Sequence, residues 1–153
     1  MKRFCLAAYA LLFLACAVPA ARAQLLMRGE ASYLVYRDRS RVNVEDITNY
    51  TDQTTGRLRF MVWASENPWD YYDRGRLIAF VLLPRLLPYQ NISDVHRTMG
   101  LNKPHTGWYY LTVTLEEQVR TESGTLRFVI RDRLEFNERQ YLWRAGDGWP
   151  FPF

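Results

Sequence analysis

The sequence predicts an all-β protein: an antiparallel β-sandwich of about seven strands that follows a cleaved signal peptide. After residue 23, apolar and polar residues alternate with a period of two over most of the chain. Polar turn residues separate these stretches at fairly regular intervals. No stretch of that region has the 3.6-residue period of an amphipathic helix. Short strands with one buried face form sandwiches or closed barrels, and a barrel is the alternative.

Residues 1–23 have the layout of a secretory signal peptide. Two basic residues at positions 2–3 precede an apolar run at 4–18, and Ala21-Arg22-Ala23 has the small residues of a cleavage site. A membrane anchor is the alternative, but the run is shorter than the roughly 20 residues that a spanning helix needs. We therefore expect cleavage after Ala23, a periplasmic or secreted product, and no membrane span after cleavage.

Loss of the signal peptide changes the charge and the cysteine content. Three basic residues leave with it, so 20 basic residues fall to 17 against 16 acidic ones, a net charge of +1. That balance argues against nucleic acid as a partner. Cys5 and Cys16 both lie in the signal peptide, which excludes disulfides, thiol catalysis and cysteine metal sites from the remaining chain. Lipidation of Cys16 is an alternative, although Phe13 stands where leucine is expected.

One sandwich domain is expected over residues 24–136. Its strands are predicted at 31–37, 41–50, 57–65, 76–84, 90–101, from 108 to a turn at 120–124, and at 125–136. Residues 76–84 are apolar on both faces, which indicates either a strand covered on both sides or an edge strand under a loop. Residues 137–153 have no clear period, and we expect this aromatic and proline-rich tail to dock on an apolar edge or insert into a partner.

Alternation assigns a face to each side chain of the central strands. The residues expected in the core are Leu58, Phe60, Val62, Ala64, Tyr109, Leu111, Val113, Leu115, Leu126, Phe128 and Ile130. The residues expected on the opposite faces are Arg57, Arg59, Met61, Trp63, Trp108, Tyr110, Thr112, Thr114, Glu116, Arg127, Arg131 and Arg133. We expect the arginines to lie on a solvated sheet face, with a ladder to Glu116 and Asp132 as the alternative.

The stretch Gly107-x-Tyr109-x-Leu111-x-Val113 resembles the G-x-Y-x-L-x-V signature of a late strand in immunoglobulin-like (Ig-like) sandwiches, including fibronectin type III and cell-adhesion-related bacterial domains. Residues 41–136 as a whole resemble short secreted bacterial modules of this kind. The resemblance implies an Ig-like sandwich and an exported protein, but no reaction. In such a strand the glycine permits a tight turn, and the tyrosine hydroxyl bonds back to the main chain at the corner. Gly107 and Tyr109 are therefore expected to be structural.

The sequence offers no catalytic, metal or cofactor site, so we expect a protein that is not an enzyme. The only histidines, His96 and His105, lack the spacing of a zinc site and are expected on the surface. No Gly-x-Ser-x-Gly nucleophile motif is present. A small hydrolase or a Ca²⁺ loop that uses Asp70 or Asp73 is a weaker alternative.

A surplus of aromatic residues outside the expected core is the feature that points to function. The candidate binding residues are Trp63, Trp69, Tyr71, Tyr72, Trp108 and Tyr110. Clustered exposed aromatics mark contact surfaces, unless the N-terminal strand or the tail folds over them. The leading hypothesis is a non-catalytic module that binds a protein or a cell-surface glycan. The alternative is an accessory subunit that engages its partner through edge strands or the C-terminal arm.

Overall fold

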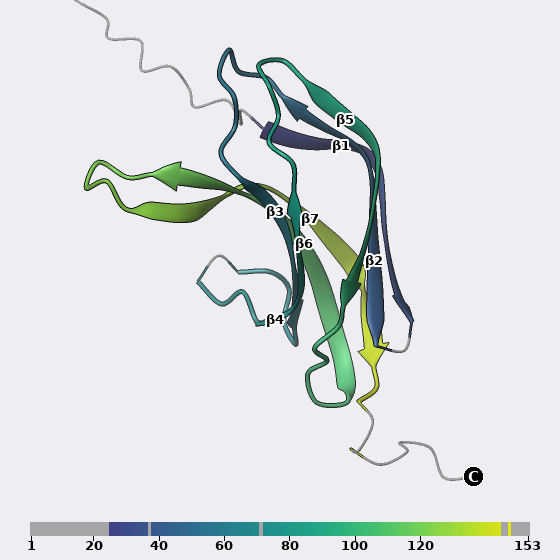
Figure 1. Ribbon diagram of the computed structural model, residues 1–153. Coiled ribbons are helices and arrows are strands. Elements are labelled where there is room, and N and C mark those ends of the chain that lie inside the picture. Colours follow the sequence, from purple (N-terminus) through teal and green to yellow (C-terminus); the bar gives the residue numbers. More distant parts are fainter. Residues whose placement is uncertain (1–24, 37, 71, 145–146, 148–153) are drawn as a thin grey trace, which may run out of the picture.

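The computed structural model describes residues 25–36, 38–70, 72–144 and 147. It confirms the predicted fold class: seven antiparallel strands form two sheets, and none of the described residues is helical (Figure 1). The predicted signal peptide and residues 148–153 of the predicted tail lie outside the described part, so cleavage after Ala23 remains a prediction.

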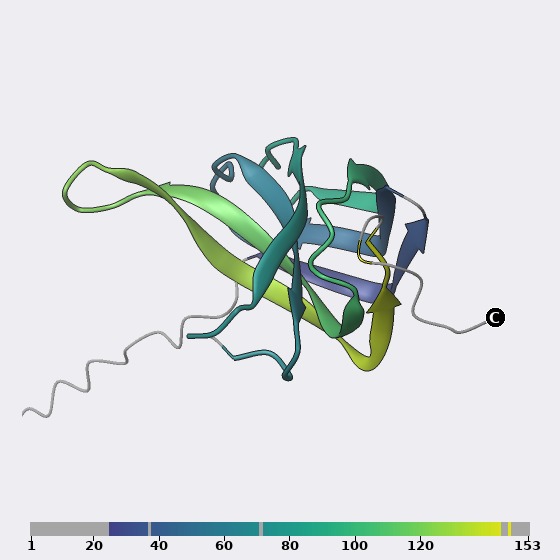
Figure 2. The ribbon, with the colours of Figure 1, turned by 90° about the horizontal axis from the view of Figure 1, so that it is seen from below.

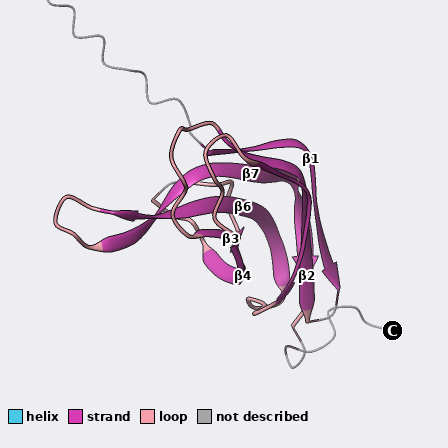
Figure 3. Cartoon of the chain, turned by 45° about the horizontal axis from the view of Figure 1, so that its top comes forward, coloured by secondary structure: helices cyan, strands magenta, loops and turns pink. Residues whose placement is uncertain are grey.

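The two sheets contain three and four strands. The first has the order β1-β2-β5, built from β1 (Leu25–Tyr36), β2 (Arg39–Asn49) and β5 (Asn91–Gly100). The second has the order β4-β3-β6-β7, built from β4 (Arg76–Leu83), β3 (Leu58–Ser65), β6 (Gly107–Arg120) and β7 (Leu126–Leu142). The long β6 and β7 curve beside the first sheet in Figure 3.

Alternate side chains of both sheets meet in one core, as the period of two requires. The apolar side chains with no exposed surface come from three strands, β2, β3 and β6: Val42, Ile47, Leu58, Phe60, Val62, Val113 and Leu115. Full burial of a side chain of this size contributes about 1.5–3 kcal/mol. The core positions predicted on the third and sixth strands are all buried, which confirms the assignment of faces there.

The edges of the two sheets approach each other on both sides of the sandwich. On one side, the Met27 amide of β1 donates a hydrogen bond to Asp132 Oδ2 of β7 over 2.7 Å. On the other side, the Asn102 amide donates to the Ile78 carbonyl of β4 over 2.8 Å. Because β1 pairs with β2 in the first sheet, it does not cover the outer face of the four-stranded sheet.

Tyr109 makes the corner contact that its sequence context predicts. Its ring lies in the core, and its hydroxyl donates to the His105 carbonyl over 2.9 Å. Burial raises the pKa of this hydroxyl, and the negative charge of Glu66 raises it further. A Cβ at Gly107 would stand 3.3 Å from the Tyr109 ring, which explains why glycine suits that position.

The last strand differs from its prediction in two ways. It continues to Leu142, six residues past the predicted end at Phe136. The inward assignment of residues 126–130 is also wrong, because Leu126 is 54% exposed and Phe128 lies on the outer face. A register shift between Leu115 and Glu116 explains the error. One extra residue in a strand turns every following side chain to the other face.

Beyond β7, the chain is fastened to the start of β6. Thr106 donates from its amide and its hydroxyl to Asp147 Oδ2, over 2.7 and 2.9 Å. These two hydrogen bonds lower the pKa of the Asp147 carboxyl, because they stabilise its ionised form.

Candidate functional site

The outer face of the four-stranded sheet brings Trp63 of β3 together with Trp69 of the following loop. Their ring centroids are 6.3 Å apart and the rings meet edge to face. Trp63 is half-buried, and its Nε1 donates to Thr114 Oγ1 of β6 over 3.1 Å. The Arg74 guanidinium stands 6.0 Å from the Trp63 ring. The β3–β4 loop thus supplies the cover for Trp63.

A second aromatic group lies further along the same face, where β6 and β7 pair. The Trp108 and Tyr141 rings are 5.2 Å apart. The Arg139 guanidinium lies 5.0 Å from the Tyr110 ring and also donates to the Glu66 carbonyl over 3.3 Å. Trp108 is 58% exposed, the most accessible of the predicted tryptophans in the described part of the chain.

The register of β3 with β6 makes these two groups neighbours. Trp63 pairs with Thr112, and Ser65 pairs with Tyr110, so the Trp63 and Tyr110 side chains stand diagonally on one face. We call this surface the aromatic face and define it as Trp63, Trp69, Trp108, Tyr110 and Tyr141. Tyr141 was missed from the sequence, because the strand was expected to end before it.

The remaining two predicted aromatics belong to the β3–β4 loop. Tyr72 is 95% exposed in the β3–β4 loop, and its amide donates to Asp70 Oδ1 over 3.0 Å. Tyr71 lies outside the described residues. Of the six candidates, the structure therefore places four on the aromatic face.

Next to the aromatic face lies a buried ion pair where sequence analysis expected a solvated surface. Glu116 is only 2% exposed, and its Oε2 accepts hydrogen bonds from Arg59 Nε and Nη2 over 2.9 and 2.7 Å. Thr114 Oγ1 donates to Glu116 Oε1 over 3.3 Å. The Arg59 guanidinium stacks 3.7 Å from the centre of the Phe128 ring. Hydrogen bonds therefore connect Trp63, Thr114, Glu116 and Arg59 across β3 and β6.

This network closes the middle of the outer face, where Met61, Thr112 and Thr114 are buried. Arg57, Arg127 and Arg133 are exposed, as predicted. Asp132, the other acid of the expected ladder, instead bonds to the Met27 amide of the first sheet. A fixed, packed support of this kind holds the aromatic rings in place.

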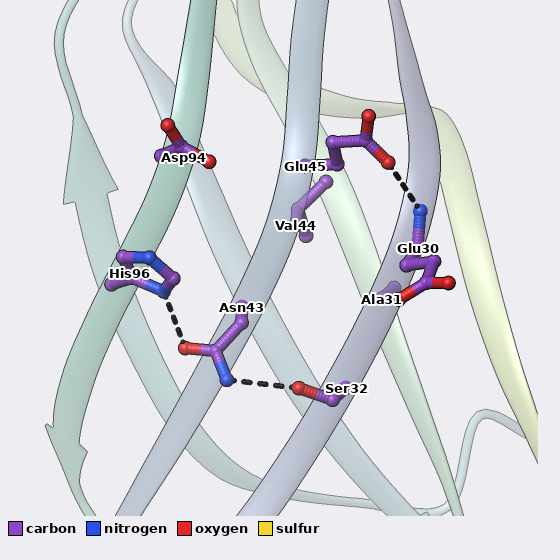
Figure 4. Close-up of a pocket in the computed structure, with 8 residues that line it drawn as sticks. All are labelled: Glu30, Ala31, Ser32, Asn43, Val44, Glu45, Asp94 and His96. Atoms are coloured by element: carbon purple, nitrogen blue, oxygen red, sulfur yellow. Dashed lines mark hydrogen bonds between the residues drawn. The ribbon is translucent and has the colours of Figure 1, made fainter.

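The outer face of the three-stranded sheet carries a shallow polar hollow of about 470 Å³ (Figure 4). Asn43 at its centre donates to Ser32 Oγ over 2.8 Å and accepts from His96 Nδ1 over 2.8 Å. Glu45 Oε2 accepts from the Glu30 amide over 3.0 Å. The central amide is thus satisfied by its neighbours on both flanking strands, which gives the hollow a structural explanation.

The described residues show no cluster of acidic, histidine or cysteine side chains that could hold a metal ion. Both histidines are exposed, as predicted. His105 lies beside Asp73 and Arg76 in an open hollow of about 320 Å³, without a hydrogen bond to a nucleophile of the described chain.

A scan against protein-family models and searches of curated proteins and solved structures found no match to this chain. In the described part of the chain, no helix has the length and apolar character needed to cross a bilayer.

Proposed function

We propose that this protein is an exported, non-catalytic binding module whose aromatic face contacts a partner protein. The observation that carries the proposal is the exposed Trp108 ring, packed against Tyr141 and next to the Tyr110–Arg139 stack. Tryptophan, tyrosine and arginine are the residues that dominate the binding energy of protein interfaces. Here they stand on a rigid sheet, so little conformational entropy is lost on binding.

The composition of this face favours a protein over a charged glycan. Arginines at positions 74 and 139 lie against aromatic rings, while Glu66 follows the end of β3 and Glu135 lies within β7, so the surface is not strongly basic. A neutral cell-surface glycan could still stack on Trp108, and it is the second outcome that the experiment separates.

The strand order supports an Ig-like sandwich of the fibronectin type III kind. Three strands, β1, β2 and β5, oppose four, and β4 pairs with β3 rather than joining the first sheet as in constant-type immunoglobulin domains. The hydroxyl of Tyr109 bonds to a carbonyl four residues upstream, which is the tyrosine-corner contact of such folds. This assignment and the export of the protein are both part of the proposal.

The test compares Trp108→Ala with Leu34→Ala, which removes an equally exposed side chain from the first sheet. Partners are isolated from native envelope extracts with the wild-type protein, identified, and then titrated against each variant; a glycan array is run in parallel. We expect Trp108→Ala to lower the affinity for the identified protein at least 30-fold. This factor corresponds to the roughly 2 kcal/mol of an interface hot spot. Leu34→Ala should bind as the wild type does.

Equal affinity of the wild type and Trp108→Ala would overturn the assignment of the site. If the wild type binds only glycans and Trp108→Ala does not bind them, the site is retained but the partner is a glycan rather than a protein.

A further inference from the structure

The distal end of the β6–β7 hairpin projects beyond both sheets (Figures 1 and 2). We call residues 119–130 the hairpin arm. On one side, the last backbone hydrogen bond to β6 from outside β7 runs from the Gln118 amide to the Arg57 carbonyl over 2.8 Å, so within the described chain β6 has no other strand beside it beyond Gln118. On the other side, β1 meets β7 at the Met27–Asp132 hydrogen bond and at the Tyr33–Phe136 ring contact, both outside the arm. The arm is therefore a two-stranded ribbon with both edges open among the described residues.

The arm is well formed, although it has no layer of core behind it. Its turn is closed by hydrogen bonds from the Thr121 amide to the Thr125 carbonyl and from the Gly124 amide to the Thr121 carbonyl, both over 2.8 Å. Arg120 Nη1 donates to the Gly124 carbonyl over 3.1 Å. A two-stranded ribbon in water is only marginally stable, and open edges pair readily with other chains. An ordered arm of this kind is suited to adding a strand from a partner.

The side chains along the free edge of β7 indicate which kind of strand could pair with it. The stretch Leu126–Arg131 is apolar at positions 126 and 128–130 and carries arginines at positions 127 and 131. Arg127 is exposed and forms no ion pair with a described residue, whereas Arg131 is held by Glu117 over 2.8 Å. Pairing two copies of this edge about Val129 would set Arg127 against Arg131, and like charges opposite each other oppose pairing. An acidic strand would instead complement the edge.

A polar groove at the root of the arm continues this surface. It has a volume of about 320 Å³ and is lined by Thr51 and residues 53–55 on one side and by Glu117, Arg120 and Arg131 on the other. A partner segment that extends past the edge of β7 would meet the hydroxyl, amide and guanidinium groups of this groove.

We infer that the hairpin arm docks an extended, acidic segment of a partner protein, which adds as a strand along Leu126–Arg131 with its carboxylates toward Arg127. This inference is independent of the aromatic face, because the arm shares none of the residues that define that face.

The test uses a synthetic octapeptide of alternating glutamate and valine, with a lysine–valine octapeptide as the charge control. Amide hydrogen exchange of the purified protein is followed with each peptide, and affinities are measured by titration. We expect the acidic peptide to protect amides of Leu126–Arg131 and to bind at least tenfold more tightly than the basic one. Arg127→Glu should reverse that preference, while Arg41→Glu, which changes an equally exposed arginine on β2, should leave it unchanged.

Three results would overturn the inference: no protection by either peptide, equal protection by both, or protection outside the arm. Protection of the same amides that depends on protein concentration, without any peptide, would show self-association through the arm. The occupant of the edge would then be a second copy of the chain and not an acidic partner. Urea midpoints of both variants are measured alongside, and they should match that of the wild type because both arginines are exposed.

Discussion

Replacing Arg59 with methionine removes the guanidinium that holds the buried Glu116 carboxylate. In the intact protein this carboxylate accepts two hydrogen bonds from Arg59 and one from Thr114. The variant keeps only the contact from Thr114, at 3.3 Å, while the glutamate stays almost without exposed surface. Removal of one partner of a buried ion pair costs about 3–5 kcal/mol. The Arg59 side chain is 26% exposed, so some water reaches the site and we expect about 3 kcal/mol.

The opposite single change and the double change make this a thermodynamic cycle. Glu116→Leu leaves Arg59 unpaired, but its guanidinium reaches solvent, so we expect a loss of about 1–2 kcal/mol. The double variant has no buried charge, and methionine and leucine fill similar volumes, so its loss should be about 1 kcal/mol or less. The coupling free energy between the two sites is then about 3–4 kcal/mol.

Urea unfolding at constant m-value measures these differences in unfolding free energy. Arg57→Met is the matched control, since Arg57 is exposed directly before β3 and its replacement should change stability by less than about 0.5 kcal/mol. The reasoning fails if Arg59→Met costs no more than the control. It also fails if the two single losses simply add up in the double variant, because the pair would then not act as a unit.

The remaining predictions concern the corner, a close contact and the C-terminal fastening. Tyr109→Phe removes the corner hydrogen bond and should lower the unfolding free energy by about 1 kcal/mol in urea titrations. An unchanged urea midpoint would show that this hydrogen bond does not contribute to stability. Gly56→Ala places a Cβ 1.9 Å from a backbone oxygen and should cost more than about 2 kcal/mol, whereas Gly100→Ala meets nothing within 4 Å and should cost under about 1 kcal/mol. The folded-state pKa of Asp147 is lowered from 3.8, so its contribution to stability is present above that value and is lost as pH falls through the folded pKa. An NMR titration should find this pKa returned toward 3.8 in Thr106→Val, and an identical pKa in both proteins would contradict the assigned cause.

Sequence alternation assigned side chains to the correct face in the regular strands, but not next to register shifts. It placed Leu58, Phe60 and Val62 in the core correctly, because successive side chains of an unbroken strand must point to opposite faces. It failed at Leu126 and Phe128, because a register shift is invisible in the apolar pattern until the partner strand is known.

The candidate site shows the same division. The sequence identified four of the five residues that form the aromatic face, since large aromatics on the polar side of a strand stand out. It could not indicate that Trp69 folds back onto Trp63, or that Glu116 is buried. The first depends on the conformation of the β3–β4 loop, and the second on the β3–β6 pairing, which sets Glu116 beside the distant Arg59.

By itself, the sequence determined an all-β chain with its strands, most of its turns and the faces of its central strands, because these follow from local alternation and turn chemistry. Only the tertiary structure decided which strand lies beside which, where the charged network closes the outer face, and that the β6–β7 hairpin projects as an arm. The physical reason is that strand pairing is made by backbone hydrogen bonds between distant segments. Those bonds carry no signature in the sequence of either strand alone.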